Sequence, residues 1–207
     1  MSVTIKQAVA DDAPFLAQMI LKSSRAGKKV GLFDFLFDMA SEEEILSKLE
    51  NLTQTESKSH CHYKNFLIAQ INGQDVGTLC SYEPRISNQE TFEKALKEIG
   101  CCEDSSGVLE AFYDCTFEIR KSTLMFDFME ESDNFVDVGV LKALMKKSLL
   151  TARLRGYRKA QSIIEIGSRE IEMFYKKLGF SFVEQKECVD YKETFGRSGI
   201  MLFEIEF

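Results

Sequence analysis

The segment from residue 124 to residue 166 limits the fold more than any other part of the chain. Its sequence predicts a strand in "LMFDFME", a long amphipathic helix in "VLKALMKKSLLTARLRG" that Gly156 closes, and a second strand in "KAQSIIEI". Two strands joined by a helix of this length favour a crossover connection, which pairs the strands in parallel. The sequence therefore predicts an α/β fold that contains a parallel strand pair.

The residues before this segment predict further strands and helices of the same sheet. Residues 65–84 contain two strand-like runs joined by an Asn-Gly pair, which favours a tight hairpin turn. A strand and a helix are expected at the N-terminus. Within a helical region at 32–52, Ser41 and Glu44 form a capping box. With two further strands near the C-terminus, we expect a mixed, mostly antiparallel central sheet flanked by helices.

Residues 85–123 contain two stretches with helical spacing, "QETFEKALKEIG" and "GVLEAFYDCTFEIR". They are too short to hold a hydrophobic core of their own, so we interpret them as a helical insertion between the third and fourth strands of a single domain, 1–207. The preferred role of this insertion is to cover one side of the sheet. As alternatives, Phe112, Tyr113 and Phe117 could line a ligand pocket or form a contact in a homodimer.

Composition and charge exclude several classes of protein. No apolar run approaches the roughly 18 residues that a membrane-spanning helix needs, and "MSVTIKQAVADD" does not resemble a secretory signal. A cytoplasmic protein without a membrane partner is therefore expected. The six cysteines lack regular spacing and are expected to be reduced thiols. The net charge of −7 disfavours binding to nucleic acid.

One part of this acidic chain is strongly basic. Between residues 136 and 159, seven basic residues stand against one acid, Asp137, for a local balance of 7 − 1 = +6. The basic residues are Lys142, Lys146, Lys147, Arg153, Arg155, Arg158 and Lys159. Such a run is either a solvated helix face or a site for an anionic ligand, and charge patterning alone favours neither.

The stretch "FYKKLGFSF" places Tyr175 near the end of a helix that Ser168 is expected to begin and Gly179 to close. The apolar positions of this helix recur at helical spacing and are Ile171, Phe174, Tyr175 and Leu178. Because an aromatic side chain on an apolar helix face is usually part of the core, spacing alone favours packing over catalysis for Tyr175.

The run "GVLKALMKKSLLTARLRGYRKAQSIIEIGSREIEMFYKKLGFSFVEQK" resembles the C-terminal half of the GCN5-related N-acetyltransferase (GNAT) superfamily. The shared pattern is a pyrophosphate loop that opens a long helix, then a strand, then Y-x-K-x-G-F at the end of the next helix. The resemblance covers the chain except for residues 85–123. It implies acetyl-CoA as donor, a primary amine on a small molecule or peptide as acceptor, and direct transfer without a covalent enzyme intermediate.

The resemblance also implies a cofactor site, in which a strand edge meets the pantetheine arm and a helix start meets the pyrophosphate. The residues concerned are Met129, Glu130, Glu131, Val136, Asp137, Val138, Gly139, Val140, Leu141, Lys142, Ser168 and Tyr175. The loop is degenerate, since the family pattern is Gln/Arg-x-x-Gly-x-Gly/Ala and this chain reads "VDVGVL". This leaves open a catalytically inactive GNAT-fold protein that binds a small molecule or a protein, and an enzyme with a different acyl group or donor.

Three residues are candidates for catalysis. The resemblance implies that Tyr175 returns a proton to the departing thiolate, a task that suits a phenol with a pKa of about 10. Asp127 is the preferred base because it interrupts an otherwise apolar strand, and Glu131 is the second choice. A polar residue on a solvated sheet face is the alternative for Asp127. Period-two alternation is expected to place Asp127, Met129 and Glu131 on one face, and Phe126, Phe128 and Glu130 on the other.

Other chemistries are poorly supported by the sequence. The only histidines, His60 and His62, lie in the loop "SHCHYKNF", which we interpret as solvated. A Ser-His-Asp or Cys-His site would have to be built from that one loop. No second Cys or His pair completes a zinc-like set of four ligands, so no metal is expected. No phosphate-loop or dinucleotide-binding glycine pattern is present.

Overall fold

A computed structural model of the chain describes residues 2–101, 106–119, 123–135, 139–167 and 169–207. Their strands form one sheet in the order β1-β2-β3-β4-β5-β7-β6. The strands are β1 Val3–Gln7, β2 Phe66–Ile71, β3 Gln74–Tyr82, β4 Leu124–Glu131, β5 Lys159–Glu165, β6 Ser181–Glu187 and β7 Gly199–Glu206. Neighbouring strands are antiparallel except for β4 and β5. The mixed, mostly antiparallel sheet is thus confirmed.

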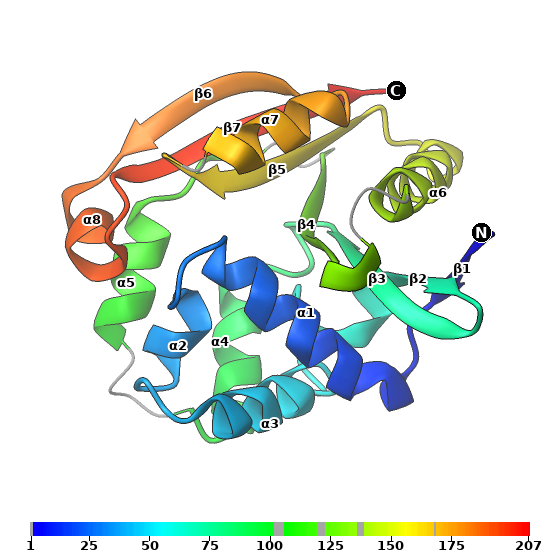
Figure 1. Ribbon diagram of the computed structural model, residues 1–207. Helices are drawn as coiled ribbons and strands as arrows, with labels where there is room; N and C mark the ends of the chain where they lie inside the picture. The colour runs from blue at the N-terminus through cyan, green and yellow to red at the C-terminus, as the bar shows by residue number, and fades with distance from the viewer. Residues whose placement is uncertain (1, 102–105, 120–122, 136–138, 168) are drawn as a thin grey trace.

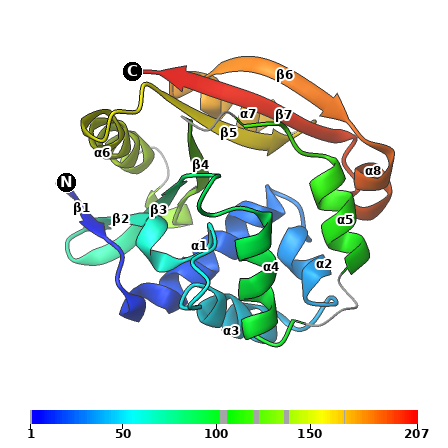
Figure 2. The same ribbon diagram turned by 180° about the vertical axis from the view of Figure 1, so that it is seen from behind.

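Helices cover both faces of this sheet (Figure 1, Figure 2). The described α-helices are α1 Ala13–Arg25, α2 Leu32–Leu36, α3 Glu42–Leu52, α4 Gln89–Glu98, α5 Ser106–Asp114, α6 Val140–Leu154, α7 Arg169–Lys177 and α8 Val189–Phe195. Short 3₁₀ turns are η1 Ala10–Asp12, η2 Tyr63–Asn65 and η4 Asp133–Phe135. Helices α4 and α5 lie between β3 and β4 in the chain, where the insertion is expected. No helix of the described residues is long and apolar enough to cross a membrane.

The core consists of two main clusters, one on each side of the sheet. Helices α1 to α4 pack against β2, β3 and β4 in the first cluster, and α6 and α7 pack against the opposite face in the second. Neighbouring residues of β2 show the division, because Ile68 belongs to the first cluster and Ala69 to the second. A strand buried on both faces explains why β2 reads as a nearly continuous apolar run.

The predicted cap of α3 and the predicted turn between β2 and β3 are both present. Ser41 Oγ accepts a hydrogen bond from the Glu44 amide at 3.3 Å, and Glu44 Oε2 accepts one from the Ser41 amide at 3.1 Å, which forms the capping box of α3. In the β2–β3 hairpin, Asn72 and Gly73 have φ angles of 53° and 79°. Both values are those of a type I′ turn, for which Asn-Gly is the favoured pair.

Two helical predictions need correction. The helical region at 32–52 is broken between α2 and α3, where Asp38 and Met39 adopt left-handed φ angles of 56° and 52°. Helix α8 is not expected from the sequence, yet Tyr191 and Phe195 anchor it in a third cluster with α5 and β7. A helix of only seven residues carries too little periodicity to be recognised before its packing partner is known.

Strands β4 and β5 pair over a very short distance. The parallel ladder contains only Leu124 with Ala160 and Met125 with Gln161, although both strands continue further. The predicted parallel crossover is therefore confirmed. Beyond Met125 the two strands separate, and their facing edges border an open space instead of each other.

A bulge in β4 contradicts the predicted alternation of its side chains. Thr78 pairs with Glu130 and Cys80 with Asp127, so β4 contains one residue more than β3 between these pairs. Phe128 takes up the extra length with a φ angle of 44°. Phe126 and Met129 consequently lie in the second cluster and Phe128 in the first. The expectation that Phe126 and Phe128 share a face, and that Asp127 and Met129 share the other, is wrong.

The expectation that all cysteines are reduced thiols is also wrong. Cys115, which follows α5, forms a disulfide with Cys188, which precedes α8, and their Cα atoms are 5.9 Å apart. The pairing could not be read from spacing because the two residues are 73 positions apart. The bond ties the end of the insertion to the β6–α8 connection.

We expect the Cys115→Ser, Cys188→Ser double variant to be about 4 kcal/mol less stable than the native chain, because a loop this long gains much conformational freedom when it is opened. Denaturant unfolding with and without dithiothreitol measures the effect. The reductant should destabilise the native chain and leave the double variant unchanged. An equal response of both proteins would show that this disulfide does not contribute to stability.

Candidate active site

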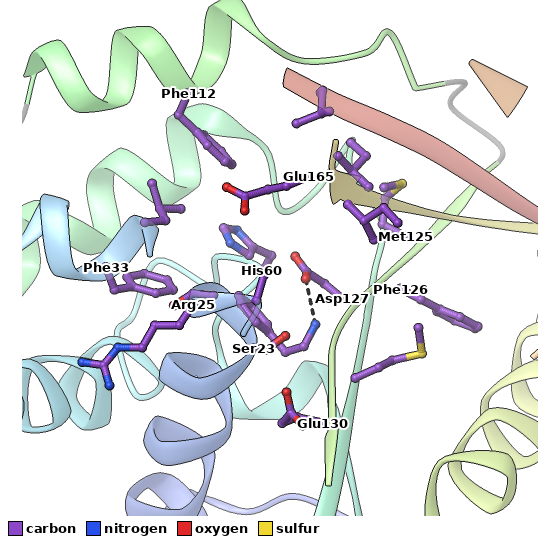
Figure 3. A pocket seen from close by; sticks show the side chains of 18 of the residues that line it. Ser23, Arg25, Phe33, His60, Phe112, Met125, Phe126, Asp127, Glu130 and Glu165 are labelled. Carbon is purple, nitrogen blue, oxygen red and sulfur yellow. Dashed lines mark hydrogen bonds between the residues drawn. The ribbon is translucent and has the colours of Figure 1, made fainter. Parts of the chain in front are cut away.

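A cavity of about 1020 Å³ lies where β4 and β5 separate. Its walls come from β4, the C-terminal end of α1, the loop before β2, α5 and α7. Figure 3 shows Asp127, Glu165 and His60 directed into this space, with Phe33 and Phe112 on the side away from β4. The cavity therefore brings together residues from most of the length of the chain.

Asp127 is a partly buried carboxylate in the wall formed by β4. Its Oδ1 accepts a hydrogen bond from the Phe128 amide at 2.7 Å, in the bulge itself. Among the described residues no cation forms an ion pair with it. Loss of hydration raises the pKa of Asp127 to about 6, against an opposing effect of that hydrogen bond. The group therefore ionises near neutral pH, as a base for an amine proton requires.

Tyr175 belongs both to the core and to the cavity wall. The side chain is 7% exposed, and its ring packs at 5.2 Å from Phe180 and 5.9 Å from Phe203, measured between ring centroids. Ser162 Oγ donates a hydrogen bond to Tyr175 Oη at 2.8 Å. Burial raises the pKa of Tyr175, and the negative charge of Asp127 contributes to the increase. Tyr175 thus remains a protonated phenol that can act as a proton donor.

The acids that follow Asp127 are partly neutralised by α1. Lys22 Nζ lies 3.2 Å from Glu130 and 2.6 Å from Asp133, and it donates a hydrogen bond to the Glu131 carbonyl at 2.6 Å. Burial raises the pKa of Glu130, whereas Lys22 lowers it. The repulsion that these acids would exert on an anionic ligand is therefore weakened.

The predicted pyrophosphate site is described in part. Val136, Asp137 and Val138, and likewise Ser168, lie outside the described residues. Gly139 precedes α6 with a left-handed φ of 84°. The N–H groups of the first helical turn, which includes Val140, Leu141 and Lys142, have no acceptor within the helix. Val140 and Leu141 have their side chains in the second cluster, where they are 0% and 7% exposed.

The basic residues in and after α6 fall into two groups, one paired with acids and one exposed. After the helix, Arg155 donates a hydrogen bond to Glu83 at 3.1 Å and Lys159 donates one to Glu204 at 2.8 Å. The lysines of the first half are exposed and are Lys142, Lys146 and Lys147. Positive charge is therefore available on the part of α6 that begins beside the cavity.

His60 was missed by the sequence analysis, and the solvated loop assigned to it is wrong. Cys61 is 0% and His62 4% exposed, and the ring of His60 lies 4.7 Å from Phe92 and 5.8 Å from Phe128 between centroids. Loss of hydration lowers the pKa of His60 to about 4, so its imidazole is neutral at pH 7. Only the aromatic residues of distant elements could have indicated this burial. Among the described residues no metal-ligand cluster is found.

The insertion contributes more than cover for the sheet. Phe112, Tyr113 and Phe117 line the cavity, and α4 brings Phe92 to it as well. Helix α4 also packs in the first cluster, so the insertion covers one side of the sheet, as expected, and in addition lines the cavity. Glu165, at the end of β5, closes the same region and pairs with Lys28 at 2.8 Å.

No protein-family model matches the sequence, and no curated protein matches it. Solved structures, in contrast, match over nearly the whole chain. An N-acetyltransferase from Staphylococcus aureus Mu50 has a TM-score of 0.69 at 15% identity, with 98% of this chain and 100% of that chain covered. An acetyltransferase of the GNAT family from Streptococcus pneumoniae has a TM-score of 0.53 at 16% identity, with 100% and 99% covered. The PaiA N-acetyltransferase from Thermoplasma acidophilum, in complex with coenzyme A, has a TM-score of 0.53 at 11% identity, with 100% of each chain covered.

These likenesses show an α/β fold that is shared over nearly the whole chain. The chain has the GNAT fold, as the resemblance in the sequence implies. At identities of 11 to 16% the comparisons establish the architecture.

Proposed function

We propose that this chain is an N-acetyltransferase that moves an acetyl group from acetyl-CoA to a primary amine by direct transfer. The observation that carries the proposal is the placement of Asp127 and Tyr175 on one cavity, at the point where β4 and β5 separate. One group accepts a proton near neutral pH and the other keeps its proton. Amine attack on a thioester needs both functions.

The described residues fit acetyl-CoA. Met129, Glu130 and Glu131 lie on the edge of β4 beyond its last pair with β5, which is where the resemblance places the pantetheine arm. The first turn of α6, after Gly139, offers N–H groups and the positive end of a helix dipole for the pyrophosphate. The side chain of Leu141 is 7% exposed and packs in the second cluster.

When bound, acetyl-CoA supplies an activated acyl group. Asp127 would hold the incoming ammonium and take its proton, so that the amine becomes nucleophilic. Glu131 is the second candidate for this task. Tyr175 Oη would give its proton to the departing sulfur, and Ser162 orients the phenol through its 2.8 Å hydrogen bond. The burial of both groups strengthens their interactions with charge that develops between them.

Titration calorimetry with acetyl-CoA tests the proposal, and saturable binding by the native chain is the expected result. A Lys142→Ala, Lys146→Ala double variant should bind at least about tenfold more weakly, since charge-assisted contacts to phosphate are lost. Lys94 and Lys97, which are also exposed but lie on α4, provide the matched control pair. If the native chain does not bind acetyl-CoA, the enzyme proposal fails, and the inactive GNAT-fold binding protein becomes the better description.

A further inference from the structure

Aromatic rings from the loop before β2 and from β3, α4, β4 and α5 line one part of the cavity. His60 and Tyr82 are partly exposed there, with ring centroids 5.4 Å apart, and Phe112 faces the same space from α5. Phe92 and Phe128 lie behind them and are 1% and 6% exposed. These five residues are called the aromatic wall. Because the His60 imidazole is neutral at pH 7, the wall carries no charge.

The cations that line the cavity are already paired. Lys22 lies 3.2 Å from Glu130, and Lys28 lies 2.8 Å from Glu165. Arg25 forms two hydrogen bonds with Asp34, of 2.8 and 3.1 Å, and a third contact with Glu42. A ligand carboxylate would have to displace one of these partners. The described residues therefore offer a poor site for a negatively charged group.

The cavity is better suited to a positively charged group. Asp127 is directed into the cavity without an ion-pair partner among the described residues (Figure 3). A partly buried carboxylate in this position gains from an ammonium group, both by charge and by hydrogen bonding. Neighbouring aromatic faces also attract cations.

We propose that the acceptor is a primary amine carried on an uncharged aromatic body, with its ammonium group on Asp127 and its ring against the aromatic wall. This inference rests on the proposed function, because it names the substrate of the same site. The ammonium group and the ring of the ligand are thus recognised by separate parts of the cavity. Amines that carry a carboxylate, such as free amino acids, are expected to be poor ligands.

The test measures binding to the native chain by calorimetry without acetyl-CoA, at pH 7.5. The reference probe is 2-phenylethylamine. Of the other three probes, 2-phenylethanol lacks the ammonium group, propylamine lacks the ring, and phenylalanine carries an added carboxylate. We expect 2-phenylethylamine to bind at least about tenfold more tightly than each of the other three. Asp127→Asn should remove the preference for the amine over the alcohol. Asp38→Asn, an exposed position outside the cavity, should leave that preference unchanged.

Equal affinities for phenylalanine and 2-phenylethylamine would contradict the expectation that the body of the ligand is uncharged. An equal affinity for propylamine would contradict the contact between the ligand ring and the aromatic wall. A preference for the amine that survives Asp127→Asn would overturn the ammonium site. A parallel titration with acetyl-CoA separates this inference from the proposed function. If acetyl-CoA binds and the aromatic amine is not preferred, only the acceptor assignment fails. Selective amine binding without acetyl-CoA binding would reject the transferase and, with it, the role of the amine as acceptor, and would leave an amine-binding cavity.

Discussion

Replacing Tyr175 with phenylalanine is expected to lower kcat for acetyl transfer by about 10²–10⁴-fold, the usual range for loss of a positioned acid. The substitution removes only Oη, and the ring keeps its contacts with Phe180 and Phe203. The departing thiolate then has no proton donor at this position. Steady-state release of coenzyme A measures the rate, and calorimetry should show a much smaller effect on the affinity for acetyl-CoA.

Ser162→Ala is the matched control for this variant. Tyr175→Phe also deprives Ser162 Oγ of its 2.8 Å partner, which is expected to cost about 1 kcal/mol of stability. Ser162→Ala breaks the same hydrogen bond but keeps the phenol, so most of the activity should remain. If Tyr175→Phe retains activity within a few-fold of the native chain while Ser162→Ala does the same, Tyr175 is a core aromatic and not the acid.

The parts of the fold that the sequence predicts correctly are those that local chemistry determines. The Asn-Gly turn, the Ser41 capping box and the β4–α6–β5 crossover each depend on residues that are neighbours in the chain. Such signals are independent of what packs against them. The Y-x-K-x-G-F pattern adds Tyr175, whose placement on the cavity wall agrees with the role that the resemblance implies.

What the sequence does not predict depends on distant contacts. Phe128 adopts a left-handed φ of 44° without a glycine or asparagine to indicate it, because the bulge is held by pairing with β3 and by packing in the first cluster. His60 becomes partly buried only once rings from α4, β3 and β4 lie against it. The bond between Cys115 and Cys188 likewise requires that α5 and α8 lie together. The aromatic wall therefore could not be assembled from sequence periodicity.

Asp127→Asn is expected to make the protein less active and more stable. Loss of the base should lower the rate by about 10²-fold or more. The native rate should rise with pH through a midpoint near 6, where Asp127 ionises, and any remaining rate of the variant should lack that midpoint. Asp38→Asn, which replaces an exposed carboxylate, should change neither the rate nor its pH dependence.

The stability effect follows from the direction of the pKa shift. Asp127 has a pKa of about 6 in the folded chain, above the ordinary value of 3.8, so between these pH values the folded chain binds more protons than the unfolded chain. Stability of the native chain must therefore fall as the pH rises through this interval, by up to about 3 kcal/mol for a shift of this size.

The asparagine of the Asp127→Asn variant keeps an oxygen that can accept the Phe128 hydrogen bond, and it cannot ionise. The variant should match the native chain in denaturant unfolding near pH 4 and exceed its stability at pH 7. A native chain that is the more stable of the two at pH 7 would mean that the charge of Asp127 is stabilised by a partner in the fold, which would argue against its role as an unpaired base.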